Sequence, residues 1–80
     1  PYEKDLLSLA EVMGSLAFLR RLCGAEDAME WPRRMEALIQ TEGSTDTRRA
    51  RLAGAYNKGF RDFALTYRIC TDNALLASAR

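Results

Sequence analysis

The most chemically specific side chains in this 80-residue chain are its two cysteines, Cys23 and Cys70. Each lies where an apolar, helix-like run gives way to turn residues, in R-R-L-C-G and in Y-R-I-C-T-D-N. The pair can form a disulfide, remain as two buried free thiols, or act as a redox couple. A redox couple is disfavoured, because both cysteines fall at expected helix C-termini, where the helix dipole opposes a thiolate.

Catalytic chemistry has little support in the composition. The chain has no histidine, which is the commonest general base and a usual member of serine or cysteine triads. Two cysteines cannot complete a thiolate metal site, and no G-x-x-x-x-G-K phosphate loop occurs. Glu11, Glu36, Glu42 and Asp62 fall at helical positions expected to face solvent. We therefore expect a protein that is not an enzyme and that uses no cofactor and no metal.

A group of arginines is expected near the pole where the two cysteines lie: Arg20, Arg21, Arg33, Arg34 and Arg68. Three of them (20, 21 and 68) fall in expected last helical turns, where a cation complements the helix dipole. Arg33 and Arg34 instead lie near a helix start, so either Glu26, Asp27 or Glu30 holds them or they face an anionic partner. Ion pairing is favoured, and a possible anionic-partner site at the five arginines is kept as a hypothesis.

The elements that position these residues are helices, because apolar residues recur at spacings of three and four. The first helix is predicted from about Glu3 to Leu22, with Leu6, Leu9, Met13 and Leu16 as its apolar positions and Gly24 as its terminator. The second helix is predicted from about Pro32 to just before Gly43, after a short turn at 27–31, because proline fits best at the first helical position. Its Trp31 is interpreted as core filler rather than as an interface residue.

The third helix is predicted to begin after a cap at Ser44 or Thr45. One apolar stripe, Leu52, Tyr56, Phe60, Phe63, Tyr67 and Cys70, extends it to the second cysteine. Gly59 lies on the same side and would let a neighbouring helix come close. A fourth helix is predicted after Thr71, which can cap it.

These segments predict one all-α domain over residues 1–80, a small three- to four-helix bundle stapled by one disulfide. Short connections make consecutive helices antiparallel, so the first and third helices run parallel and bring Cys23 and Cys70 to one pole. Closing that loop would stabilise the fold by about 4 kcal/mol in the chain-entropy model. A disulfide in turn indicates an oxidising compartment, either the periplasm or an extracellular space.

Overall composition is ordinary for a globular domain, with 48% hydrophobic residues, 29% charged residues and a formal net charge of +1. No basic stripe with interleaved aromatic residues appears, so nucleic acid is not an expected partner. The apolar runs are far shorter than the roughly 20 residues of a membrane-spanning helix. The chain begins at Pro1 without an initiator methionine, which favours a processed or trimmed form that a secretory signal could have preceded.

Four segments carry a resemblance to a known family: P-Y-E-K-D-L-L-S-L-A-E-V-M-G, F-L-R-R-L-C-G, W-P-R-R-M-E-A-L-I and R-L-A-G-A-Y-N-K-G-F-R-D-F-A-L-T-Y-R-I-C-T. With them the chain resembles a family of small exported proteins of unknown function from alphaproteobacteria, chiefly rhizobial relatives, although Pro32 departs from the family pattern. The resemblance implies export, with a signal peptide that has been removed, and it supports the disulfide. It also implies that Leu75 to Arg80 begin a longer helix, and it implies no activity.

Together these features predict a non-catalytic protein of the periplasm that binds another envelope protein. The alternative is a periplasmic chaperone or stress protein that binds unfolded clients through exposed apolar surface.

Overall fold

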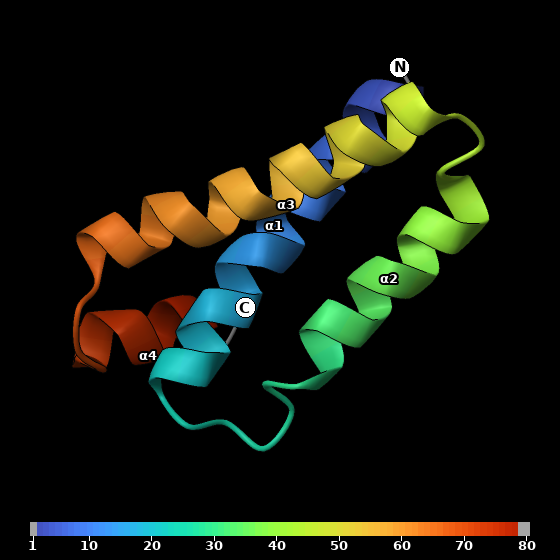
Figure 1. Ribbon diagram of the computed structural model, residues 1–80. Coiled ribbons are helices and arrows are strands. Elements are labelled where there is room, and N and C mark those ends of the chain that lie inside the picture. The colour runs from blue at the N-terminus through green and yellow to red at the C-terminus, as the bar shows by residue number, and fades with distance from the viewer. Residues whose placement is uncertain (1, 79–80) are drawn as a thin grey trace.

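The computed structural model describes residues 2–78, and within that range it contains four helices and no strand (Figure 1). The helices are α1 (Tyr2–Leu22), α2 (Glu30–Glu42), α3 (Asp46–Thr66) and α4 (Asp72–Ser78). The predicted all-α class is therefore confirmed. No helix among these residues is both long and apolar enough to cross a membrane.

The end of α1 is built as the sequence predicts. Gly24 has a φ of 66°, in the left-handed region that suits glycine. The amide of Ala25 donates to the carbonyl of Arg20 at 2.8 Å, and the amide of Gly24 donates to the carbonyl of Arg21 at 3.2 Å. This pair of bonds is a Schellman motif, which satisfies carbonyls that the helix end leaves free.

The predicted start of α2 is wrong by two residues, because the helix begins at Glu30 and Pro32 is its third residue. The first four amides of a helix have no intrahelical partner, so the missing N–H of proline costs no hydrogen bond at this position. Met29 is the N-cap residue and makes no side-chain capping bond.

The predicted cap of α3 is confirmed at Thr45, whose side chain accepts a hydrogen bond from the amide of Arg48 at 3.0 Å. The predicted extension of this helix to Cys70 is wrong, because α3 ends at Thr66 and Tyr67 is already extended. Thr66, Ile69 and Thr71 lie at and after this helix end, and their β-branched side chains have a lower helix propensity.

Thr71 caps α4, as the sequence predicts: its Oγ1 accepts a hydrogen bond from the amide of Ala74 at 3.2 Å. The chain between Tyr67 and Thr71 is a loop, so Cys70 lies in a connection and not at a helix end. The part of the expected C-terminal helix that follows Ser78 lies outside the described residues.

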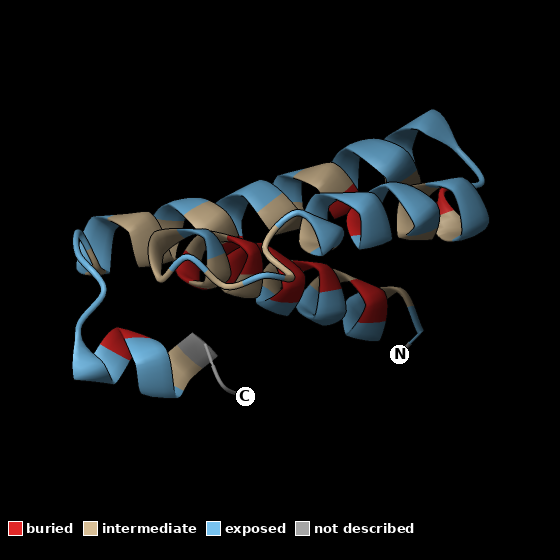
Figure 2. Cartoon of the chain, turned by 90° about the horizontal axis from the view of Figure 1, so that it is seen from below, coloured by how far each residue is buried: buried red, intermediate tan, exposed pale blue. Residues whose placement is uncertain are grey.

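Packing is concentrated between α1 and α3, which run side by side (Figure 1). The main core consists of Leu6, Ala10, Met13, Met35 and Leu52, and Ala17, Leu19 and Ala74 are buried outside it. Figure 2 shows buried residues gathered on the inner face of α1. Trp31 is partly buried against this core, which agrees with its interpretation as core filler. The main core therefore lies toward the N-terminal part of α1, and the disulfide joins the opposite pole.

Candidate binding surfaces

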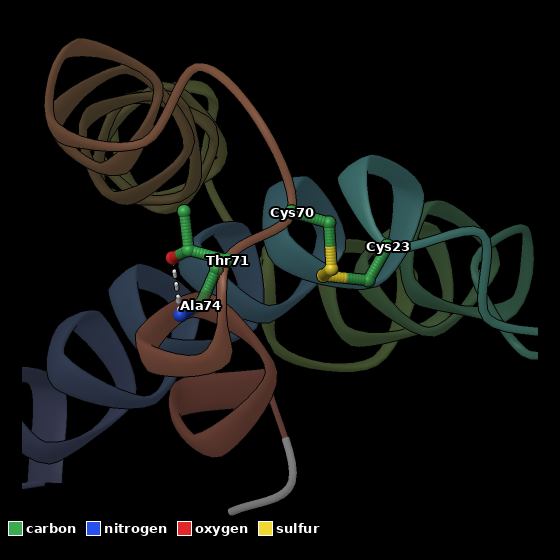
Figure 3. Close-up of a disulfide and its surroundings, with 4 residues drawn as sticks. All are labelled: Cys23, Cys70, Thr71 and Ala74. Atoms are coloured by element: carbon green, nitrogen blue, oxygen red, sulfur yellow. Dashed lines mark hydrogen bonds between the residues drawn. A yellow bond between two sulfur atoms is a disulfide. The ribbon is translucent and has the colours of Figure 1, made fainter.

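The two cysteines form the predicted disulfide, with their Cα atoms 5.0 Å apart (Figure 3). Cys23 directly follows α1, and Cys70 lies in the loop that connects α3 to α4. Both cysteines are bonded, so the alternative of two free thiols is wrong. The bond ties the end of α1 to the start of α4 and leaves Cys70 exposed to solvent.

Two of the five arginines at this pole form ion pairs, one with Asp27 in the connection between α1 and α2 and one with Glu30 in the first turn of α2. Arg20 Nη1 lies 2.8 Å from Asp27 Oδ2, and this ion pair is largely shielded from solvent. Arg34 Nη2 lies 3.2 Å from Glu30 Oε2 on the exposed face of α2, and its guanidinium lies 4.8 Å from the Trp31 ring centre. Ion pairing, which the sequence favoured for both Arg33 and Arg34, is therefore confirmed for Arg34 and, among the described residues, wrong for Arg33.

Arg21, Arg33 and Arg68 are exposed and form no ion pair among residues 2–78. Arg68 lies beyond the end of α3, so the expectation that it complements the dipole of the last helical turn is wrong. Arg20 and Arg21 do lie in the last turn of α1. The anionic-partner site stays a prediction, and these three arginines are the ones whose charge is available for it.

An open groove of about 840 Å³ lies between α1, the C-terminal end of α3, and α4. It is lined mainly by apolar and aromatic side chains and by a few small polar ones: Ser8, Glu11, Val12, Ser15, Leu16, Leu19, Phe63, Tyr67, Asn73, Leu76 and Ala77. Glu11 is the only residue with a formal charge in this lining. The groove can therefore remove apolar surface of a partner from water, and its lining offers no nucleophile paired with a base.

Sequence reasoning missed this groove, although α1 carried a signal for it. Leu6, Leu9, Met13 and Leu16 were predicted as one packing stripe, and the structure divides them between two faces of α1. Leu6 and Met13 are buried in the core, whereas Leu9 is 48% exposed and Leu16 lines the groove. Val12, next to them on the outer face, is 54% exposed. α1 has more apolar residues than one buried face can hold, and this excess in the sequence could have indicated a second, exposed apolar face.

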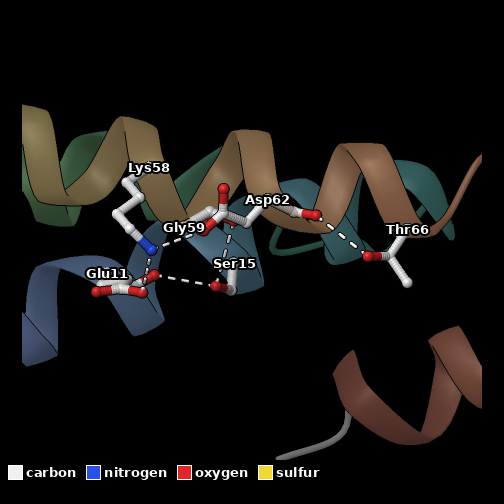
Figure 4. A network of polar contacts seen from close by, with 6 residues as sticks. All are labelled: Glu11, Ser15, Lys58, Gly59, Asp62 and Thr66. Atoms are coloured by element: carbon white, nitrogen blue, oxygen red, sulfur yellow. Dashed lines mark hydrogen bonds and ion pairs between the residues drawn. The ribbon is translucent and has the colours of Figure 1, made fainter.

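One edge of the groove carries an ion-pair network between α1 and α3 (Figure 4). Lys58 Nζ lies 3.3 Å from Glu11 Oε1 and 2.7 Å from Asp62 Oδ2. The hydrogen bond from Lys58 holds the pKa of Asp62 below its ordinary value, and the hydrogen bonds to Asp62 and Glu11 raise the pKa of Lys58. Asp62 and Lys58 are therefore charged at neutral pH, and with Glu11 they form the polar edge of an otherwise apolar groove.

Ser15 lines the groove beside this network and contacts the backbone of both α1 and α3. Its Oγ donates to the carbonyl of Glu11 at 3.0 Å and lies 3.4 Å from the carbonyl of Gly59 in α3. A buried hydroxyl that is bonded to backbone on both helices costs little to bury. This contact also holds α1 and α3 at close range where they line the groove.

Comparison with known proteins assigns a family and no activity. A family model with the description "Protein of unknown function (DUF2385)" matches residues 1–80. No curated protein and no solved structure matches the chain. The described residues also hold no group of three or more histidine, cysteine or acidic side chains that could bind a metal ion.

Proposed function

The chain belongs to the family described as "Protein of unknown function (DUF2385)", and from its geometry we propose that it is a non-catalytic binding module. In this proposal the protein works in the bacterial periplasm and binds another envelope protein. The docking site is the groove between α1, α3 and α4, and the occupant is an amphipathic helix of the partner.

The observation that carries the proposal is the open apolar groove with its extension along α1. Leu9, Val12 and Leu16 recur at spacings of three and four, which is the spacing of a stripe on one helix that meets a second helix. Leu9 and Val12 are about half exposed, and Leu76 across the groove is 69% exposed. An amphipathic helix that places its apolar face on this stripe is a common mode of peptide recognition.

The groove already shows how a helix packs against α1, because one of its walls is a helix. Its third wall is α4, which packs against α1 and contributes Asn73, Leu76 and Ala77. The outer stripe continues past α4 toward the N-terminus of α1, where no described helix covers Leu9 or Val12. A partner helix on that part of the stripe would bury side chains that now face water, at about 25 cal/mol for each Å² of apolar area.

The cellular compartment in this proposal rests on two supports. A disulfide forms and persists in oxidising compartments, and Cys23 and Cys70 are joined. The resemblance to small exported alphaproteobacterial proteins implies export as well. Fractionation of a bacterium that carries the full gene, with immunodetection of the periplasmic and cytoplasmic pools, tests the compartment directly.

A photo-crosslinking amino acid at position 12 tests the docking site in living cells. The matched control places the same amino acid at position 54, because Gly54 is exposed on α3 and a Cβ there has no neighbour within 4 Å. We expect one discrete adduct with another protein from position 12 and none from position 54. Leu76→Glu, which puts a charge into the groove, should abolish the adduct. Equal adducts from both positions, or none from position 12, would contradict the proposal.

The alternative function, a periplasmic chaperone, is favoured by apolar side chains that are exposed outside the groove. Met29, Leu65 and Ile69 are each more than two-thirds exposed. A chaperone would suppress aggregation of many unfolded clients, and its binding of an apolar dye would rise under acid or heat stress. A docking module should leave client aggregation unchanged and bind the dye equally before and after mild stress.

A further inference from the structure

We propose that the Cys23–Cys70 disulfide is a thiol-sensitive latch that holds α4 in place as the third wall of the groove. This inference rests on the proposed function, because it concerns the regulation of the same docking site. In the oxidised protein the groove is complete. In the reduced protein α4 leaves, and the partner helix loses one side of its site.

The first support is that α4 depends on the disulfide for its position. Among the described helices it packs against α1 alone. Its start is fixed by Cys70, two positions before Asp72, while the Thr71 cap acts only within α4. Figure 3 shows this arrangement, with the sulfur bridge beside the first turn of α4.

The second support is that the main core does not involve α4. Its five buried residues come from α1, α2 and α3, and none comes from the loop that carries Cys70. Release of α4 uncovers Ala74, which is fully buried, and the neighbouring Leu16 and Leu19 of the groove. Reduction is therefore expected to open one pole of the molecule and to leave the packing of the other pole in place.

The third support is access, because a reductant must reach a sulfur. Cys70 and its neighbours Ile69 and Thr71 are exposed, and Cys23 is half-buried. The reductant is a dithiol. One of its thiolates attacks Cys70 Sγ, and Cys23 leaves as a thiolate and is protonated. The second thiol of the reductant then attacks the mixed disulfide, which releases Cys70 as a thiol and the reductant as its own disulfide. Two electrons and two protons pass to the protein.

Amide hydrogen exchange read by mass spectrometry tests the latch on the oxidised chain, on the chain reduced with dithiothreitol, and on the reoxidised chain. We expect the α4 amides from Ala74 to Ser78 to exchange about tenfold faster or more after reduction, and to recover on reoxidation. Amides around Ala10 and Leu52 should change by less than about twofold. Unchanged exchange in α4 would overturn the latch. Loss of protection along the whole chain would overturn it too, since the disulfide would then be a global staple.

A matched variant separates the disulfide from the cap. Thr71→Ala removes the capping oxygen of α4 and keeps both cysteines. We expect it to retain most of the protection of α4. If it loses as much protection as the reduced chain does, the cap and not the disulfide holds the helix, and the latch is overturned.

Crosslinking from position 12 in both redox states separates the latch from the function on which it rests. An adduct in the oxidised state that disappears after reduction supports both. An adduct of equal yield in the two states retains the docking site and overturns the latch. No adduct in the oxidised state contradicts the docking site itself, and the exchange experiment then stands as the independent test of the latch.

Discussion

The backbone of Gly14 in α1 lies directly against the backbone of Tyr56 in α3. A Cβ at Gly14 would lie 2.8 Å from the carbonyl carbon of Tyr56 and would overlap its oxygen, and one at Gly59 would lie 2.9 Å from the carbonyl carbon of Glu11. Each helix thus contributes a glycine where the other helix presents backbone. This close approach brings Ser15 within reach of the Gly59 carbonyl and places the groove-lining residues of both helices side by side.

Alanine at either of these glycines should destabilise the protein. Gly14→Ala and Gly59→Ala each force the helices apart, and overpacking of this kind costs about 1–3 kcal/mol. Gly54→Ala is the matched control, because it lies in the same helix as Gly59 with open space around it. We expect it to be neutral or to stabilise by up to about 1 kcal/mol through helix propensity. Urea unfolding followed by circular dichroism measures all three; equal effects at positions 54 and 59 would contradict the close approach.

The two ion pairs at the disulfide pole should differ in strength. Arg20 and Asp27 are largely shielded from solvent, so Asp27→Asn leaves a partly buried guanidinium without its charge partner. The expected loss is about 1–3 kcal/mol of unfolding free energy. Glu30→Gln breaks the exposed pair with Arg34, which should cost at most about 0.5 kcal/mol. Thermal unfolding of both variants measures the two losses of stability. A larger loss for Glu30→Gln than for Asp27→Asn would contradict the prediction that the shielded pair is the stronger one.

The ion-pair network at the groove edge makes a prediction about pH. Lys58 holds the pKa of Asp62 below its ordinary value of 3.8. A carboxyl with a lower pKa in the folded state stabilises the fold above its unfolded pKa, and that contribution is lost as the pH falls through its folded pKa. Lys58→Met should therefore raise the pKa of Asp62 and weaken the acid dependence of stability. Carboxyl-carbon NMR titration reads this pKa, with Lys4→Met as control; an unchanged Asp62 pKa would refute the assignment.

The arginines without an ion pair provide a test of the anionic-partner site. Arg33→Glu combined with Arg68→Glu should weaken binding of a polyglutamate probe by about tenfold at low ionic strength, and added salt should remove most of the difference. Arg51→Glu is the control, because Arg51 pairs with Glu3 in the N-terminal part of α1, away from the disulfide. Affinity that is unchanged in the double variant, or reduced equally in the control, would remove this surface from consideration.

Local signals were sufficient for much of the fold. The existence of four helices, the caps at Thr45 and Thr71 and the glycine terminator after α1 all follow from spacing and capping chemistry within a few residues. The Cys23–Cys70 pairing followed from the parallel course of the first and third helices, which short connections impose. Each of these features depends on neighbours in the chain or on simple connectivity.

Tertiary contacts decided the features that concern binding. The spacing of apolar residues in α1 cannot tell which of its two apolar stripes is covered; α2 and α3 bury Leu6 and Met13, whereas Leu9 and Val12 remain exposed. The groove exists only because α4 turns back onto α1 after the disulfide loop. In the same way, Asp27 reaches Arg20 and leaves Arg33 unpaired. The sequence determined which helices form, and the tertiary structure determined which apolar surface stays open, because burial depends on which other segments pack there.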